Sequence, residues 1–332
     1  MDNNAGLRMN ELSKKIHAIS ALAILCVVIG HSPLGQSPIA SFVELFCITW
    51  PVPWFLLVSG FFYRKTLERY SVAEVVVKKC RGLVIPYFLW CAVAAILVDG
   101  HVSVETFALS SGTPTPNVNL WYLHALIALM FFVMVCREGA KLIFPLRVVD
   151  AVTVFISVCF FVNVNTHRFF GVNSTPFWFL TGYFLSCFNW IEMIRARCST
   201  RNVAWLIFSL FLILGVRVVW YIAHPERAID VVLRIFWIVG VVSWLWAFLD
   251  MRRAPQVLLK ISNFVFFVYC VHAVFMSLLK SAWVTLFGTT ELSLECGFFF
   301  VAIFTIGLSF LCACLMHRVC PRIYLLLSGG RG

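Results

Sequence analysis

Two histidines lie deep inside long apolar stretches of this sequence, where an ionisable side chain is costly and is therefore a candidate for function. At about 1.5 Å per residue, His31 lies roughly 22 Å beyond Ile16, where its stretch begins, and His272 lies roughly 17 Å into a later stretch. A histidine can stay neutral there at modest cost, which keeps an imidazole nitrogen available for proton transfer. Each could instead be a structural histidine that is hydrogen-bonded to a neighbouring helix.

Other polar side chains recur at a similar depth. Ser262, Tyr269 and His272 are spaced by seven and three residues, which places them on one face of a helix. The outer end of another apolar stretch carries Asn119, Trp121, Tyr122 and His124. Glu44 could orient His31 or balance its charge, or its carboxylate could simply reach the lipid headgroups. The pattern predicts a polar cavity in the outer half of a helical bundle.

The composition requires a membrane. Of the 332 residues, 61% are hydrophobic and only 12% are charged, so a soluble fold could not bury the apolar surface. The apolar runs are about twenty residues long and do not alternate, which favours transmembrane helices over a barrel. The net charge of +11 does not indicate nucleic-acid binding, because the basic residues lie between apolar runs instead of on a continuous polar face.

The thirteen cysteines do not predict a metal site. They are scattered through the apolar runs without a C-x-x-C pair, so they are interpreted as small apolar fillers. Cys312 and Cys314 are one residue apart, but no histidine or second cysteine pair flanks them at metal-ligand spacing. No metal and no permanently bound cofactor is therefore expected.

The predicted fold is an all-α, polytopic transmembrane bundle that forms one integral-membrane domain over residues 1–332. About ten spans are expected, at 16–32, 40–62, 83–99, 119–136, 147–165, 175–190, 203–222, 231–249, 262–284 and 297–317. Most of the 26 basic residues fall in alternate loops, as the positive-inside rule requires. Both termini are therefore predicted to be cytoplasmic, with 1–15 as an N-terminal segment and 318–332 as a tail.

Six motifs, in order along the chain, resemble those of the membrane acyltransferase 3 family. The first is an apolar run that closes on Gly30-His31, and the second is an apolar run that ends in Ser59-Gly60. The others are a basic segment leading to Pro86-Tyr87, the element Leu120-Trp121-Tyr122-Leu123, the pair Gly182-Tyr183, and a Ser262, Tyr269 and His272 element. Each is weak alone, but six at sensible spacing are a specific signal. Many family members carry arginine eleven residues before the motif histidine, whereas this chain has Ser20 there.

The resemblance implies an integral-membrane O-acyltransferase of the bacterial inner membrane. Its donor would be cytoplasmic acyl-CoA, with acetyl-CoA favoured, and its acceptor a hydroxyl of a cell-surface glycan or lipid-linked sugar. His31 would be a general base or a transient acyl carrier, with Glu44, Tyr269 and His272 as further catalytic residues. The residues expected near the acceptor or the developing oxyanion are Ser59, Asn119, Trp121, Tyr122 and His124.

Cations on the cytoplasmic side fit the polyanionic donor. The candidates for acyl-CoA binding are Arg64, Lys78, Lys79 and Arg81. The positive-inside rule alone would also place charges there, so these residues could serve topology and nothing else.

Two other classes of function stay open. A transporter or flippase of a glycan precursor would also need a polar cavity beneath aromatic residues, although the paired repeats common in transporters are not visible. A structural subunit or sensor would fit the lack of metal and nucleotide motifs. The sequence leaves the acceptor glycan, the acyl chain and the oligomeric state undetermined.

Overall fold

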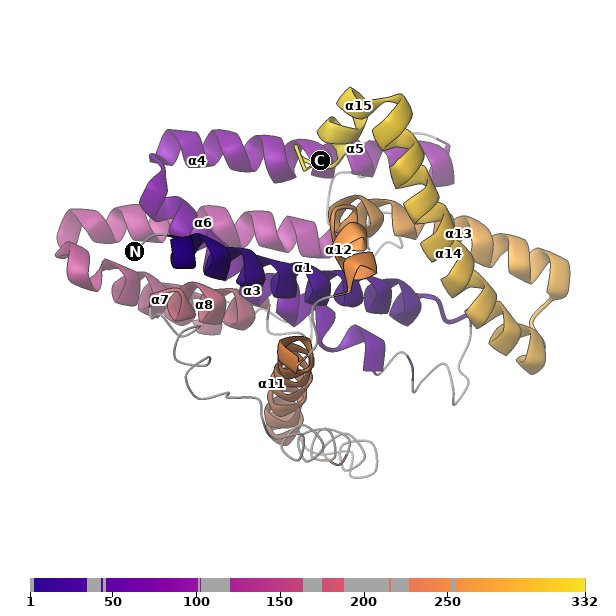
Figure 1. Ribbon diagram of the computed structural model, residues 1–332, viewed down its shortest axis with the longest axis horizontal. Helices are drawn as coiled ribbons and strands as arrows, with labels where there is room; N and C mark the ends of the chain where they lie inside the picture. Colours follow the sequence, from indigo (N-terminus) through magenta and orange to yellow (C-terminus); the bar gives the residue numbers. More distant parts are fainter. Residues whose placement is uncertain are drawn as a thin grey trace.

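The computed structural model describes residues 3–34, 43, 46–100, 102, 120–163, 175–187, 215, 227–251 and 255–331, and within them every regular element is helical. The predicted all-α class is confirmed for this part of the chain. Its helices, which Figure 1 shows, are α1 (Asn3–His31), α3 (Pro51–Arg69), α4 (Val72–Lys79), η1 (Cys80–Val84), α5 (Ile85–Ala94), η2 (Ala95–Asp99), α6 (Trp121–Ile143), α7 (Leu146–Asn163), α8 (Thr175–Leu185), α11 (Arg227–Met251), α12 (Gln256–Ser262), α13 (Val265–Phe287), α14 (Glu291–Val319) and α15 (Pro321–Leu327).

Five segments of the described chain are long and apolar enough to cross a membrane. They are Ser13–His31, Phe46–Arg69, Val72–Leu97, Val265–Phe287 and Glu291–Val319. These segments overlap five of the expected spans, and two shorter apolar helices, Val148–Phe160 and Phe236–Leu249, fall within two more. The expected span at 203–222 lies outside the described residues except for one position. The total of about ten spans and the cytoplasmic position of both termini stay predictions.

The third of these segments begins earlier than expected because its start is capped. The Ser71 hydroxyl accepts the backbone N–H of Glu74 at 3.4 Å, and the Glu74 carboxylate accepts the backbone N–H of Ser71 at 2.9 Å. This capping box satisfies amide groups that a helix start otherwise leaves unpaired. From there α4, η1, α5 and η2 continue without a break, and the two wider π-helical turns mark places where the hydrogen-bond register shifts.

Two glycines allow α3 and α8 to approach backbone to backbone. A Cβ atom on Gly60 would overlap the Phe179 carbonyl oxygen, and one on Gly182 would overlap the Leu57 carbonyl oxygen. Small residues at such crossings let membrane helices pack closely. Two of the family-like motifs, Ser59-Gly60 and Gly182-Tyr183, thus have a packing role.

Helix α1 runs through the middle of the bundle, with α13 and α14 beside its C-terminal half (Figure 1). An apolar cluster fixes this arrangement: Val27 and Val28 of α1 pack with Val268 and Met276 of α13 and with Val301 of α14. Burial of such side chains against each other holds the helices in register. The end of α1 is thereby placed against the middle of α13, which is where the two candidate histidines lie.

Candidate active site

The structure brings the two predicted histidines together. His31 is the last residue of α1, and His272 lies in α13, 241 positions later in the numbering. Their imidazole rings stack with centroids 6.1 Å apart and planes 24° apart. His272 is only 1% exposed, whereas His31 is partly exposed. Two imidazoles from distant parts of the chain therefore form one stacked pair, of which His272 is buried.

The hydrogen bond of His272 defines its tautomer. Its Nδ1 lies 2.5 Å from the carbonyl oxygen of Tyr269, and a carbonyl oxygen can only accept, so Nδ1 carries the proton. The neutral ring then has an unprotonated Nε2. This nitrogen is buried and has no hydrogen-bond partner among the described residues. It can accept a hydrogen bond from a substrate hydroxyl or from a protonated neighbour.

Lys280 fixes the end of α1 from the same helix that carries His272. Its ammonium donates to the carbonyl oxygens of His31, at 2.7 Å, and Pro33, at 2.8 Å. The last carbonyls of a helix have no intrahelical partner, so this cation satisfies them and complements the helix dipole. The His31 backbone is thus held in place by a side chain two turns beyond His272.

We expect Lys280→Met to lower the kcat of acyl transfer about tenfold, because one charge-assisted hydrogen bond at the end of α1 contributes on the order of 1.5–3 kcal/mol. The KM for the acyl donor should not change. Steady-state kinetics on the purified protein would check this, with Lys280→Arg as the variant that retains a cation. Equal losses in both variants would contradict a positioning role for the charge.

Aromatic rings extend the site from the histidine pair toward α3 and α6. Tyr269 lies 5.9 Å from His272 and 5.6 Å from Tyr122, measured between ring centroids. Tyr122 in turn contacts Phe55 at 6.2 Å and interacts with the Ser59 side chain. Tyrosine hydroxyls here could donate hydrogen bonds to an oxyanion in a low-dielectric surrounding.

The remaining residues that were predicted near the acceptor do not all lie beside the histidine pair. Trp121 packs edge-on against Tyr122 with ring centroids 6.5 Å apart, so it belongs to the same group of aromatic rings. His124 points elsewhere, since its ring contact is with Tyr87 of α5 at 6.0 Å. Glu44 and Asn119 lie outside the described residues, so their predicted roles stay predictions.

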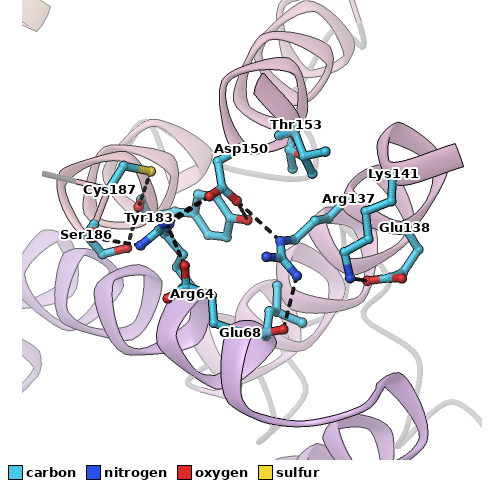
Figure 2. Close-up of polar contacts among 12 residues, drawn as sticks. Arg64, Glu68, Arg137, Glu138, Lys141, Asp150, Thr153, Tyr183, Ser186 and Cys187 are labelled. Carbon is cyan, nitrogen blue, oxygen red and sulfur yellow. Dashed lines mark hydrogen bonds and ion pairs between the residues drawn. The ribbon is translucent and has the colours of Figure 1, made fainter. Parts of the chain in front are cut away.

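The predicted acyl-CoA cations fall into two groups. Arg64 lies in an ion-pair cluster: its guanidinium contacts Asp150 at 2.9 Å, Glu68 at 2.8 Å and the Ser186 carbonyl oxygen at 2.9 Å (Figure 2). Its hydrogen-bonding capacity is thus largely used inside the protein. The others lie on α4 and η1: the Lys78 ammonium is 2.8 Å from the Tyr70 ring centroid, the Lys79 ammonium is 5.2 Å from the Tyr63 ring centroid, and Arg81 is exposed.

Asp150 is the centre of the cluster in Figure 2 and was missed by the sequence analysis. It accepts hydrogen bonds from Arg64 at 3.0 Å, from Arg137 at 3.3 Å and from the Tyr183 hydroxyl at 2.8 Å. Arg137 also donates to the Leu67 carbonyl oxygen at 3.1 Å. One carboxylate thus joins α3, α6, α7 and α8. The signal was available, because Asp150 is an acidic residue within an apolar run, where ionisable groups are rare.

Among the described residues, no group of three or more His, Cys, Asp or Glu side chains lies together as the ligands of a metal ion would. The fold and the site in this part of the chain define a helical membrane protein with a stacked pair of imidazoles next to tyrosine rings. Its family can be stated as well. The family model of the acyltransferase 3 family, described as an acyltransferase domain, matches residues 14–315, and the chain belongs to this family of membrane acyltransferases. No curated protein and no solved structure gives a significant match.

Proposed function

We propose that this protein transfers an acyl group, acetyl by preference, from cytoplasmic acyl-CoA to a hydroxyl of an extracytoplasmic cell-surface glycan, and that it acts in the bacterial inner membrane. The observation that carries the proposal is the stacked pair of His31 and His272, 6.1 Å apart, within a chain of the acyltransferase 3 family. Acyl transfer to a hydroxyl needs a base that is neutral and sheltered from water, and a buried imidazole meets both needs.

In the base route, a nitrogen of His31 takes the proton of the acceptor hydroxyl. The hydroxyl oxygen bonds to the thioester carbonyl carbon, the C–S bond breaks, and the CoA thiolate leaves with a proton returned by the imidazolium. In the carrier route, a nitrogen of His31 bonds to the acyl carbon, the C–S bond breaks, and CoA leaves with the imidazole proton. The acceptor hydroxyl then bonds to the acyl carbon, the C–N bond to His31 breaks, and the hydroxyl proton returns to the imidazole. In both routes the Tyr269 hydroxyl is suited to stabilise the oxyanion, and the Nε2 of His272 is suited to accept a proton from the acceptor or from His31.

An assay with labelled donor tests the function. Purified protein in lipid vesicles, given radiolabelled acetyl-CoA and a lipid-linked or surface glycan, should place label on the glycan as an ester. A transporter or flippase of the glycan would give no labelled ester. Incubation without acceptor separates the two routes, because only the carrier route leaves label covalently on the protein.

The donor side gives a second prediction. Arg81 is exposed on η1, in the half of the segment Val72–Leu97 that the predicted topology places toward the cytoplasm. We expect Arg81→Ala to raise the KM for acetyl-CoA about tenfold with little change in kcat, because a phosphate contact far from the reacting carbon binds ground state and transition state alike. Steady-state kinetics with varied acetyl-CoA measures this. An unchanged KM would remove Arg81 from the donor site.

A further inference from the structure

The segment that follows α15 folds back onto η1 and brings one more cation to the bundle. Helix α15 is docked by its own contacts: the indole N–H of Trp90 on α5 donates to the Leu327 carbonyl oxygen at 3.0 Å, and the Tyr324 ring stacks on Phe267 at 5.4 Å. The chain end marked in Figure 1 lies beside the junction of α4 and α5. The segment is thus held against the rest of the protein through α15.

Two glycines make this return possible. Gly329 and Gly330 have φ values of 66° and 75°, in the left-handed region that other residues rarely adopt. The Gly330 amide donates to the Leu325 carbonyl oxygen at 2.7 Å, a bond typical of a glycine-terminated helix. A Cβ atom on Gly329 would overlap the Gly82 carbonyl oxygen, so only glycine allows the approach.

The Gly82 carbonyl oxygen is available because of a proline. In an α-helix it would accept the N–H of residue 86, and Pro86 has none. Instead it accepts a hydrogen bond from Nη1 of Arg331 at 3.1 Å, and the same nitrogen donates to the Ser328 carbonyl oxygen at 3.1 Å. The guanidinium also lies over the Phe266 ring, 4.1 Å from its centroid. Backbone and ring together give Arg331 a defined position.

Arg331 contacts η1 through Gly82 and α13 through Phe266, so it links the segment that carries Lys79 to the helix that carries His272. Lys79 lies one turn before Gly82 on the same continuous helical segment, so the guanidinium that bonds to Gly82 comes near the turn that carries Lys79. Phe266 precedes His272 by six residues, or about 9 Å along α13. Within the described residues neither Arg331 nor Lys79 forms an ion pair with a carboxylate, and the Nε and Nη2 atoms of Arg331 donate to none of those residues. Two cations that no carboxylate of the described residues pairs with favour an anionic ligand.

We propose that Arg331 and Lys79 form an anion site for a phosphate group of the acyl donor, built by the segment after α15 against the π-helical turn at Gly82. Naming the anion as part of acyl-CoA rests on the proposed function, whereas the anion site itself does not. Arg331 is exposed as a residue, and Nε and Nη2 are the guanidinium atoms that would donate to a phosphate. A phosphate held there would leave the pantetheine arm, which carries the thioester, to extend toward the histidine pair.

Binding of acetyl-CoA to the full-length protein in detergent tests the proposal. We expect Arg331→Gln to weaken binding about tenfold, the loss of one charge-assisted hydrogen bond, and Arg331→Lys to recover part of it. Arg322→Gln is the matched control. Arg322 is an exposed arginine on α15, so this variant changes the net charge by the same amount but not at η1. Gly329→Ala should weaken binding as well, since it displaces the segment.

Each outcome has a distinct meaning. If Arg331→Gln binds acetyl-CoA as tightly as Arg322→Gln does, the proposal is overturned. Tighter binding by Arg331→Gln would also overturn it, because the Arg331 side chain would then block the ligand. If the wild-type protein does not bind acetyl-CoA at all, the proposed function fails, and inorganic pyrophosphate becomes the probe. Pyrophosphate binding that is lost in Arg331→Gln would still support the anion site, whereas no pyrophosphate binding by the wild type would overturn it.

Discussion

His31→Ala should reduce acyl transfer to the glycan by on the order of 10³-fold, within the range that general bases contribute. The imidazole of His31 stacks on that of His272 and lies at the end of a helix that Lys280 holds in place, so its removal takes away the base or carrier of the proposed reaction. The variant should still insert and fold, because His31 is partly exposed and its removal leaves the Val27 and Val28 packing intact. Label transfer from acetyl-CoA measures the loss.

His17→Ala is the matched control for this variant. His17 lies on the same helix, fourteen residues earlier, and is exposed, so its replacement should leave transfer near the wild-type rate. Elution of each variant as a single species from a sizing column would show that both are folded. Normal transfer by folded His31→Ala protein would show that His31 is neither the base nor the acyl carrier. Equal loss of transfer in both variants would indicate that the substitutions disturb α1 as a whole.

The helical class and the two candidate histidines could be predicted because their causes are local, whereas the stacking of the two rings joins distant segments and could not. Apolar runs of about twenty residues determine helices in lipid whatever surrounds them, and five such segments are present in the described chain. His31 and His272 stood out because an ionisable group in such a run is costly. That Tyr269 belongs beside His272 followed from a spacing of three residues on one helix face, and the ring distance of 5.9 Å confirms it. The prediction that Ser262 shares this face was wrong, because Ser262 is the last residue of the separate helix α12.

The residues whose roles were predicted wrongly or not at all take those roles from contacts between distant segments. Such contacts cannot be inferred from a single sequence. Arg64 looked like its neighbours Lys78 and Lys79 in a basic segment, yet Asp150, 86 residues away, binds its guanidinium. No feature of the sequence indicated a role for Lys280, because that role depends on the end of α1 packing against α13. His124 was grouped with Tyr122 by proximity, but the helix turns its ring toward α5.

Asp150→Asn should destabilise the protein by about 3 kcal/mol, the range for removing one partner of a buried ion pair. The carboxylate lies between the guanidinium groups of Arg64 and Arg137, and its side chain is 19% exposed. Asparagine keeps the size but removes the charge, so two cations would face each other on neighbouring helices, and the Tyr183 hydroxyl would lose a charged acceptor. The midpoint of thermal unfolding in detergent should fall clearly below that of the wild type.

Glu138→Gln separates this effect from the loss of any ion pair. Glu138 contacts Lys141 at 2.6 Å on the surface of α6, with side chains 35% and 31% exposed, and such a pair contributes about 0–1 kcal/mol. Its midpoint should therefore stay close to that of the wild type. Because Asp150 joins four helices and touches neither histidine, the transfer rate per folded Asp150→Asn molecule should be unchanged. A folded variant that is stable but inactive would instead make Asp150 part of the chemistry, and a midpoint equal to that of Glu138→Gln would mean that the cluster stabilises no more than a surface pair.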